Sequence, residues 1–434
     1  MCRSHGRSRR SQARPADNLR AAITSLCLNF LSLRSKPLRR IVRFGTRVRL
    51  RQAARRVSGL AAATLIPVLA CLTGCKDTPD PNPNYREYAY VSNGGSNTVT
   101  VIDLRALAIL KTVPVGKSPT GLAVNPRKNE IYVANTESNS ISVIDAETNT
   151  VAATIGVHRA PFFIDVSSDG KRAYVANSGS ANLSVIDLEQ RRVLRNISTG
   201  NGSNLARLTP DGKLVIVALR DEDSLAVVDT GQMTLRSKLK VCAKPVEMAI
   251  VPDSSKVFVA CSESKQVGVV DLKTDKLLAQ LDVGKTPIHL VVKPDGGEAF
   301  VANYDGSSVS EMITGSNEVN STFPIGDHPV HLLVSSDNAL LYVANFGSDS
   351  VAVYSIDNAK RTSSVPVGSH PEGLAFSPNQ LLLLVVNNGS GDMTVLSLLD
   401  NKGRPQPEAP SLETMIPLGK DPRAIVVKAF VSQR

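Results

Sequence analysis

The strongest constraint on the fold of this chain is a repeat that returns every 42 residues. Each unit carries an anchor, which is an aromatic or aliphatic residue followed by Val-Ala-Asn or a close variant. Eight anchors follow one another without an insertion or deletion: Tyr90–Asn93, Tyr132–Asn135, Tyr174–Asn177, Ile216–Leu219, Phe258–Cys261, Phe300–Asn303, Tyr342–Asn345 and Leu384–Asn387. Self-similarity at one fixed period indicates repeat units that share a continuous core, rather than domains with separate cores.

A second marker, usually proline, lies 29 residues after the start of each of the first seven anchors. These markers are Pro119, Pro161, Ser203, Pro245, Pro287, Pro329 and Pro371. The eighth, Pro422, comes nine residues late, so we expect the extra residues in the Pro-rich stretch 401–410 of the last unit.

Each unit contains four short segments rich in Val, Ile, Thr and Tyr, which in the second unit are 122–124, 130–135, 141–145 and 150–155. Strands separated by such short turns can only pair antiparallel. Several segments are apolar on both faces, and radial packing of four-stranded blades covers both faces. The sequence therefore predicts an all-β, eight-bladed β-propeller over residues 86–430. The C-terminal segment 425–427 would supply the innermost strand of the first blade. Seven blades plus a stray segment is the alternative.

These motifs resemble the YVTN-type β-propeller family of the prokaryotic cell envelope. The resemblance rests on Y-V-A-N, S-V-I-D and P-x-G-L-A-V patterns that run from Tyr88 to Phe430. It implies an exported propeller. Related propellers include lactonases and the haem-binding propeller of periplasmic nitrite reductases, so it also implies that an enzyme or cofactor site is one possible use of the channel.

The N-terminal residues 1–75 differ in charge from the rest of the chain. They hold fifteen Arg and one Lys against one acidic residue, whereas residues 76–434 hold 34 basic and 38 acidic side chains. A nucleic-acid footprint needs clustered basic residues on the folded domain. Because the basic excess lies outside the repeats, we expect no nucleic-acid partner.

This N-terminal part is typical of a bacterial export signal. An Arg-rich stretch precedes an apolar run over 57–72, which is too short for an ordinary membrane span, and the run ends in Leu-Thr-Gly-Cys. The ending resembles the lipobox, which implies that Cys75 carries a lipid and becomes the mature N-terminus. A plain signal peptide with an incidental cysteine is the alternative. Residues 76–85 form a polar, Pro/Asn-rich spacer. We expect a monomeric propeller anchored in the envelope, at the outer membrane because Asp does not follow Cys75.

Candidate binding residues lie near the second marker, where the innermost strands of a propeller begin. Two residues after it, three consecutive units carry Glu247, His289 and His331, and His328 and His370 lie just before it in two units. Two imidazoles and a carboxylate are a plausible set for a divalent metal. They are equally suited to hydrogen-bond a ligand, to transfer protons, or to line a wet channel.

Two further pairs stand out. Four residues after the marker, Asp165 and Arg207 replace the apolar residues of most other units, so we expect an ion pair between neighbouring blades, or an Arg207 site for an anionic ligand. Cys242 and Cys261 are the only cysteines after residue 75. They fall at the same end of one unit, and an oxidising compartment favours a structural disulfide between them.

The sequence contains no metalloprotease, haem-attachment, nucleophile-elbow or phosphate-loop motif. It therefore favours a non-catalytic binding or protein-interaction scaffold on the envelope, without a cofactor. The alternative is a channel-mouth site for a metal or an anionic small molecule in a lactonase-like or haem-propeller-like enzyme.

Overall fold

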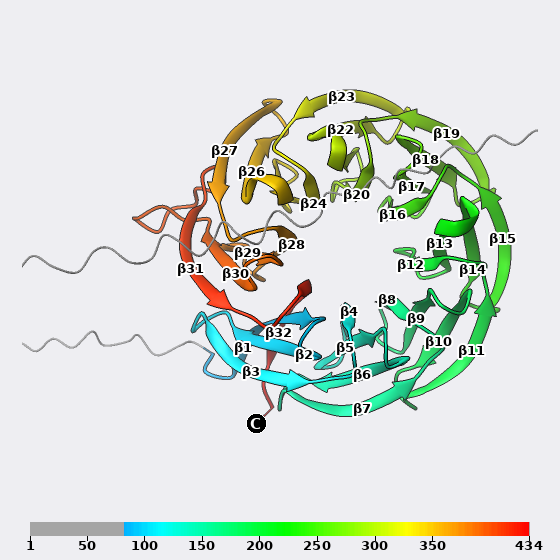
Figure 1. Ribbon diagram of the computed structural model, residues 1–434, viewed down its shortest axis with the longest axis horizontal. Coiled ribbons are helices and arrows are strands. Elements are labelled where there is room, and N and C mark those ends of the chain that lie inside the picture. Colours follow the sequence, from blue (N-terminus) through cyan, green and yellow to red (C-terminus); the bar gives the residue numbers. More distant parts are fainter. Residues whose placement is uncertain (1–81, 434) are drawn as a thin grey trace, which may run out of the picture. The chain divides into compact units, whose positions relative to one another are not determined.

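The computed structural model describes residues 82–433, which form a ring of eight antiparallel four-stranded sheets (Figure 1). Seven sheets are continuous in the sequence, with strand order β4 to β7, β8 to β11, β12 to β15, β16 to β19, β20 to β23, β24 to β27 and β28 to β31. We number these blades 2 to 8. Blade 1 has the order β3-β2-β1-β32, so it joins the two ends of the described chain.

The innermost strand of each blade lies nearest the central axis (Figure 1). These strands are β32 (Pro422–Val431), β4 (Pro119–Val124), β8 (Pro161–Val166), β12 (Ser203–Leu208), β16 (Pro245–Ile250), β20 (Pro287–Val292), β24 (Pro329–Val334) and β28 (Pro371–Phe376). The second strands, which contain the anchors, are β1 (Tyr85–Asn93), β5 (Glu130–Asn135), β9 (Arg172–Asn177), β13 (Leu214–Leu219), β17 (Lys256–Cys261), β21 (Glu298–Asn303), β25 (Leu340–Asn345) and β29 (Leu382–Asn387).

The third and fourth strands complete each blade toward the rim. The third strands are β2 (Thr98–Asp103), β6 (Ser140–Asp145), β10 (Asn182–Asp187), β14 (Ser224–Asp229), β18 (Gln266–Asp271), β22 (Ser308–Ile313), β26 (Ser350–Ser355) and β30 (Asp392–Ser397). The outermost strands are β3 (Ala108–Pro114), β7 (Thr150–Gly156), β11 (Arg192–Ser198), β15 (Thr234–Lys240), β19 (Lys276–Asp282), β23 (Glu318–Pro324), β27 (Lys360–Pro366) and β31 (Ser411–Pro417).

The eight-bladed prediction and the predicted closure are confirmed. β32 pairs antiparallel with β1 from Tyr85↔Val431 to Asn93↔Pro422, so the C-terminal strand is the innermost strand of blade 1. The seven-bladed alternative is wrong. Strand β1 begins at Tyr85, which the sequence had assigned to the spacer. The predicted signal segment, Cys75 and most of the spacer lie outside the described residues.

Repeated polar residues shape the turns. Asp145, which ends the third strand of blade 2, accepts hydrogen bonds from the backbone N–H groups of Glu147 (2.7 Å) and Thr148 (3.2 Å). Side-chain acceptance of this kind stabilises a tight turn. Asp103 and Asp187 do the same in blades 1 and 3, which explains the Asp of the S-V-I-D motif.

The core is divided into eight apolar clusters, one between each pair of neighbouring blades. Between blades 2 and 3, for example, Tyr132 and Ile141 pack against Ile164 and Val175. The anchor rings Tyr90, Tyr132, Phe258, Phe300 and Tyr342 are fully buried in such clusters. Since each blade is stabilised by its two neighbours, an open ring would leave two unpacked faces.

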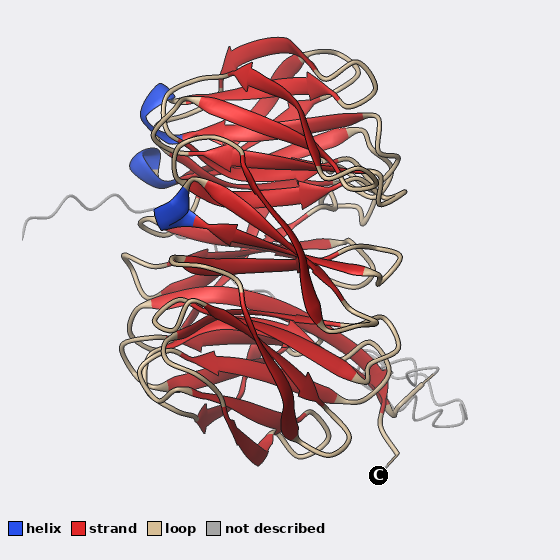
Figure 2. Ribbon diagram, turned by 90° about the vertical axis from the view of Figure 1, so that its right-hand side faces the viewer, coloured by secondary structure: helices blue, strands red, loops and turns tan. Residues whose placement is uncertain are grey.

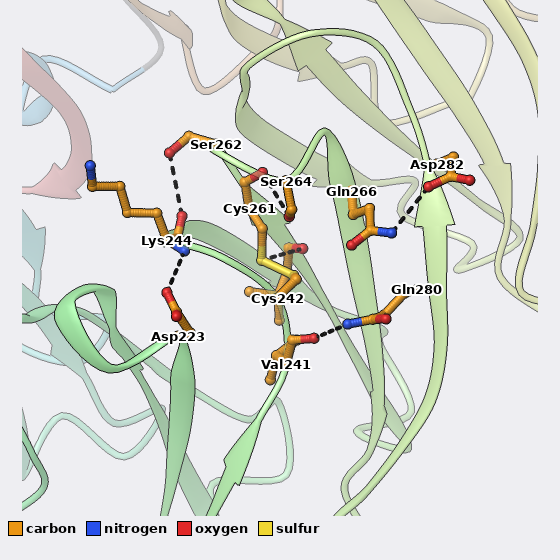
Figure 3. Close-up of a disulfide and its surroundings, with 11 residues drawn as sticks. Asp223, Val241, Cys242, Lys244, Cys261, Ser262, Ser264, Gln266, Gln280 and Asp282 are labelled. Atoms are coloured by element: carbon orange, nitrogen blue, oxygen red, sulfur yellow. Dashed lines mark hydrogen bonds between the residues drawn. A yellow bond between two sulfur atoms is a disulfide. The ribbon is translucent and has the colours of Figure 1, made fainter.

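The anchor Asn lies so close to the loop before the innermost strand that five blades have a glycine there. A Cβ atom on Gly116, Gly284, Gly326, Gly368 or Gly419 would lie 2.3–2.7 Å from the anchor Asn of the same blade. Blade 5 has Cys242 and Cys261 at these two places. They form a disulfide with a Cα–Cα distance of 5.8 Å, and Figure 3 shows it beside the loop that leads into β16. The disulfide thus replaces the Gly–Asn contact of five other blades.

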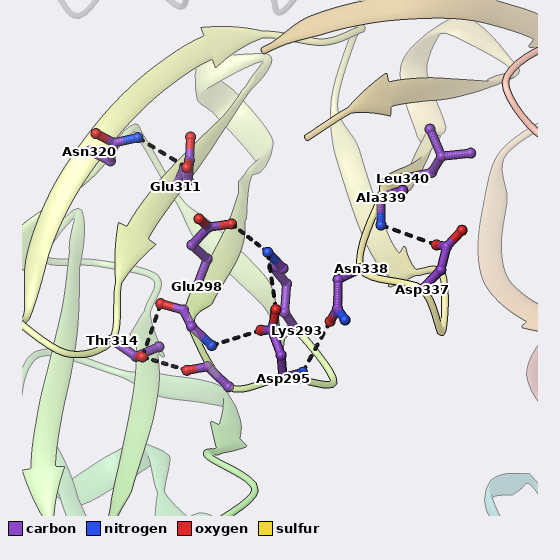
Figure 4. Close-up of polar contacts among 12 residues, drawn as sticks. Lys293, Asp295, Glu298, Glu311, Thr314, Asn320, Asp337, Asn338, Ala339 and Leu340 are labelled. Carbon is purple, nitrogen blue, oxygen red and sulfur yellow. Dashed lines mark hydrogen bonds and ion pairs between the residues drawn. The ribbon is translucent and has the colours of Figure 1, made fainter. Parts of the chain in front are cut away.

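The two faces of the ring differ. The face on which the innermost strands begin, here called the mouth face, carries the short helices η1 (Arg220–Glu222), η2 (Tyr304–Gly306) and η3 (Phe346–Ser348), seen together on one side in Figure 2. On the opposite face, turns link neighbouring blades. Figure 4 shows the backbone N–H of Asp295 donating to Oδ1 of Asn338 at 3.0 Å, beside a Lys293–Glu298 ion pair of 3.1 Å.

The extra residues of the last unit lie where the spacing predicted. They form the connection between β30 and β31, and they fold back onto blade 7. The Tyr342 hydroxyl donates to the carbonyl of Pro407 (3.0 Å), and the Ser363 hydroxyl donates to that of Glu408 (2.8 Å). Within residues 82–433, no helix has the length and apolar character that crossing a membrane requires.

Candidate functional site

A cavity of about 390 Å³ opens where the innermost strands begin. All eight innermost strands contribute residues to its wall. Seven of the eight residues found two positions after the marker line it: Gly121, Phe163, Glu247, His289, His331, Gly373 and Ala424. Leu205, at the same position of blade 4, is instead buried in the cluster between blades 4 and 5.

The wall of this cavity has two chemically different arcs. Blades 1 to 3 line the cavity mostly with apolar residues, here called the apolar arc: Gly121, Leu122, Phe162, Phe163, Ala424, Ile425 and Val426. Thr120 and Arg423 are the polar residues that these blades contribute. The polar arc comes from blades 4 to 8 and consists of Arg207, Glu247, His289, His331 and Glu372. A mostly apolar concave site with a few convergent polar groups is the usual form of a small-molecule site.

Arg207 lies at the junction of the two arcs. Its guanidinium carbon lies 4.5 Å from the centre of the Phe163 ring, and its Nη2 lies 3.2 Å from Oε1 of Glu247. A planar guanidinium held by a ring and a carboxylate is fixed in orientation. The Arg207 side chain is 37% exposed, so its remaining N–H groups can reach the cavity.

The expected ion pair between Asp165 and Arg207 is wrong. Asp165 accepts hydrogen bonds from the backbone N–H groups of Val166 and Leu208, each 2.9 Å long, and Arg207 pairs with Glu247 of the next blade. Burial raises the pKa of Asp165, and these two hydrogen bonds and the nearby Arg207 act in the opposite direction. Asp165 therefore braces blades 3 and 4 through the backbone.

His289 and His331 lie side by side, with ring centroids 4.1 Å apart and ring planes inclined by 39°. The backbone N–H of Leu332 donates to Nδ1 of His289 at 3.3 Å, so the proton of the neutral His289 ring is on Nε2. Burial and the charge of Arg207 lower the pKa of His289 to about 3. Burial also lowers the pKa of His331 well below its ordinary value, and the neighbouring His289 adds to that effect. Both rings are neutral at pH 7.

The metal interpretation of Glu247, His289 and His331 is not supported. Within residues 82–433, no group of three or more His, Cys, Asp or Glu side chains is arranged to hold a metal ion. The physical reason lies in their contacts. Oε1 of Glu247 already binds Arg207 and the backbone N–H of Met248, and Nδ1 of His289 accepts a backbone N–H.

His328 and His370 do not line the cavity. They lie on the mouth face and contact aromatic residues that follow the anchors of blades 6 and 7. His328 packs on Tyr304 with ring centroids 4.4 Å apart, and His370 stacks on Phe346 at 4.3 Å. Nδ1 of His328 also lies 2.9 Å from Oδ1 of Asp327. These two histidines therefore connect neighbouring blades on the mouth face.

Among the cavity-lining residues that the sequence interpretation missed are Phe162, Glu372 and Arg423. They share the position one residue after the marker. Most other units have a small polar or aliphatic residue there, so the signal was present in the sequence. Burial raises the pKa of Glu372; the charge of Arg423 opposes this shift, and the charge of Asp421 adds to it. The guanidinium of Arg423 is itself paired with Asp421 at 2.7 Å.

The family model of the YNCE-like beta-propeller matches residues 122–206 and 194–431, which is well over half of the chain. The chain belongs to the YNCE-like β-propeller family. This membership agrees with the repeat motifs and with the propeller fold of the structure. No protein of curated function matches the chain.

Several solved structures share the fold of this YNCE-like chain at low sequence identity. Hydrazine synthase of Kuenenia stuttgartiensis is 20% identical, with a TM-score of 0.54 over 64% of this chain and 95% of that chain. Dihydro-heme d1 dehydrogenase NirN, solved in complex with DHE, is 14% identical, with a TM-score of 0.65 over 78% and 74%. A putative 6-phosphogluconolactonase of Bacteroides uniformis is 14% identical, with a TM-score of 0.54 over 79% and 99%. At these identities the likeness extends to the fold alone.

Proposed function

We propose that this YNCE-like propeller is a non-catalytic binding protein of the bacterial envelope that takes a small ligand into its central cavity. One observation carries the proposal. The innermost strands share one backbone geometry, yet the polar arc gathers Arg207, Glu247, His289, His331 and Glu372 opposite an apolar arc. A wet channel with no ligand would not need a guanidinium that Phe163 and Glu247 hold in one orientation.

The state of the two histidines supports binding rather than proton transfer. A general base works best when its pKa lies near the working pH. The pKa values of His289 and His331 are both lowered well below that range, so these rings are weak bases. They are suited to packing and hydrogen bonding.

A plug variant tests the proposal. A Cβ at Gly373 would meet its nearest protein atoms at 3.4–3.5 Å, so Gly373→Leu can fill the cavity without a backbone clash. Gly315→Leu is the matched control, because nothing lies within 4 Å of a Cβ there. We expect ligands found by thermal-shift screening to stabilise the wild-type protein and the control but not the plug variant. Stabilisation of all three would place binding outside the cavity and contradict the proposal.

The envelope location is part of the proposal. It rests on the Leu-Thr-Gly-Cys sequence that ends at residue 75, which supports lipidation of Cys75. With this anchor, the propeller would lie at the outer membrane, among the proteins of the envelope. Mass spectrometry should find a lipid-modified Cys75 at the mature N-terminus. A Cys75→Ala protein that stays in the membrane fraction would contradict it.

An enzyme is the second candidate, favoured by one observation. Glu372 lines the cavity, has no hydrogen-bond partner within residues 82–433, and has a raised pKa, which suits a proton donor. Propellers of similar fold include one described as a putative 6-phosphogluconolactonase. Turnover of lactones that is lost in Glu372→Gln would favour the enzyme over the binding protein.

A further inference from the structure

The opposing walls of the cavity present one cationic and one anionic group with unused hydrogen-bonding capacity. Arg207 comes from blade 4 and Glu372 from blade 8, which face each other across a ring of eight. Arg207 makes one hydrogen bond, to Glu247, although a guanidinium has five N–H donors. Within residues 82–433, no hydrogen bond to the Glu372 carboxyl is present. The site therefore offers donors on one side and an acceptor on the other.

The flank between these two groups is apolar. Phe162 lines the cavity and is 42% exposed, so its ring is accessible to an apolar ligand group. Leu122 and Ile425 continue this surface. Covering such a ring with an apolar ligand group removes it from water, and this burial is favourable.

The opposite flank consists of the paired imidazoles. His289 presents Nε2–H as a donor. Within the described part of the chain, Nδ1 of His331 is buried without a hydrogen-bond partner. Neutral rings of this kind add polar contacts without adding net charge. The charged groups that a ligand meets are therefore Arg207 with its partner Glu247, and Glu372 with Arg423.

From this arrangement we infer that the ligand is a small apolar zwitterion, an amino acid or short peptide whose carboxylate binds Arg207, whose ammonium binds Glu372, and whose apolar group covers Phe162. The inference rests on the proposed function and narrows it to one class of ligand. The volume of about 390 Å³ limits the ligand to a few residues at most. Single amino acids and dipeptides share this chemistry and differ in the separation of their charges.

Calorimetric titration with four probes tests the inference. Phenylalanine and phenylalanyl-phenylalanine carry both charges, phenylpropionate lacks the amine, and phenethylamine lacks the carboxylate. We expect one of the two zwitterions to bind at least about tenfold more tightly than either single-charge probe, which corresponds to one additional charge-assisted contact. The better zwitterion identifies the charge separation that the site accepts.

Two variants assign the contacts. Arg207→Met should weaken binding of the zwitterion and of phenylpropionate about tenfold and leave binding of phenethylamine unchanged. Glu372→Gln should weaken binding of the zwitterion and of phenethylamine about tenfold and leave binding of phenylpropionate unchanged. Arg191→Met is the matched control for the first, because Arg191 is also part-exposed (38%) and paired, with Glu130 at 3.1 Å, but does not line the cavity. Glu311→Gln is the control for the second, because Glu311 is buried and bonded to Asn320 on an outer strand pair (Figure 4).

The outcomes separate the inference from the proposed function. If all four probes bound with equal affinity and Gly373→Leu abolished this binding, the zwitterion inference would be overturned. The proposed function would remain, as a cavity that binds apolar ligands. Binding that neither variant changes would overturn the assigned contacts. If no probe bound, but screening found another ligand that the plug variant excludes, the zwitterion inference would fail and the proposed function would stand. Should Arg207→Met fail to fold, Arg207→Lys and the Glu372→Gln arm still decide.

Discussion

The apolar and polar arcs of the cavity wall have the same backbone and opposite chemistry. Blades 1 and 2 place Ala424 and Gly121 two residues after the marker, and blades 5 and 6 place Glu247 and His289 at the same position. The second strands of these blades are equally buried and carry the same kind of anchor. The comparison teaches that the anchors determine the ring, whereas the residues of the innermost strands are free to determine the chemistry of the cavity wall.

The largest expected effect comes from removing the strand that carries part of the apolar arc. Deleting residues 422–434 removes β32 and leaves the edge of β1 exposed. Ile425, Val427 and Phe430 would no longer cover the clusters on either side of blade 1. We expect a loss of at least about 5 kcal/mol in the free energy of unfolding, measured by urea titration, because three large apolar side chains lose their burial.

A shorter deletion is the control for this closure. Deleting residues 432–434 leaves β32 intact, since the strand ends at Val431. The unfolding midpoint should then stay close to that of the full chain. If the long deletion were no more harmful than the short one, the ring would not depend on β32.

The second prediction concerns the disulfide beside the polar arc. Cys242→Ser should lower the free energy of unfolding by about 3 kcal/mol, because the bond closes a loop with a sequence separation of 19. The double variant Cys242→Gly/Cys261→Asn should recover much of this loss, since it restores the Gly–Asn contact of five other blades. The single variant Cys261→Asn should be the worst, because the Cβ of residue 242 would meet the new side chain. If the three variants were equally stable, the disulfide would not be a replacement for the Gly–Asn contact.

The third prediction uses pH to separate the arcs, because the paired histidines belong only to the polar arc. Their pKa values are depressed in the folded state, that of His289 to about 3 from an ordinary 6.5. Their stabilising contribution is therefore complete above pH 6.5 and decreases as the pH falls toward the folded values. Between pH 7 and pH 5 the protein should lose about 1 kcal/mol or more of stability.

The variant His289→Phe/His331→Phe should reduce this loss over the same pH range. Asp165 and Glu372 have raised pKa values and so act in the opposite direction at lower pH, which is why the comparison stops at pH 5. His370→Gln, which changes an exposed rim histidine, is the control. A double variant that loses as much stability as the wild type would show that other groups cause the acid sensitivity.

The smallest expected effect concerns the ion pair at the junction of the arcs. Arg207→Met should cost about 1 kcal/mol of stability, since the side chain is part-exposed and water screens the pair. Adding Glu247→Gln should recover part of this loss by removing the unpaired carboxylate. Additive losses in a double-mutant cycle by thermal unfolding would show that the pair contributes nothing.

The sequence predicted the ring well because regular spacing carries the necessary information. Eight anchors fix eight blades, and the late Pro422 fixes the insertion before β31. The strands predicted in blade 2 agree with β4 to β7 except at their ends. The positions of Cys242 and Cys261 in the repeat also place them at one end of blade 5, where the structure joins them.

The sequence predicted the contacts of the site less well, because repeat position does not determine the direction of a long side chain. Arg207 lies on a blade between those of Asp165 and Glu247, and both carboxylates are one blade away. Arg207 pairs with Glu247 because Asp165 is already bound by backbone N–H groups and because the Phe163 ring packs against the guanidinium. Likewise, His328 and His370 turn to the rim because Tyr304 and Phe346 offer aromatic surfaces there.

The most direct test of the two-arc cavity is a crystal structure of the protein soaked with small fragments that contain an apolar ring and a polar end. The account predicts fragment density in the cavity, with the ring against Phe162 and the polar end within hydrogen-bond distance of Arg207 or Glu372. Crystals in which fragments bind elsewhere, while the cavity holds only water, would contradict it.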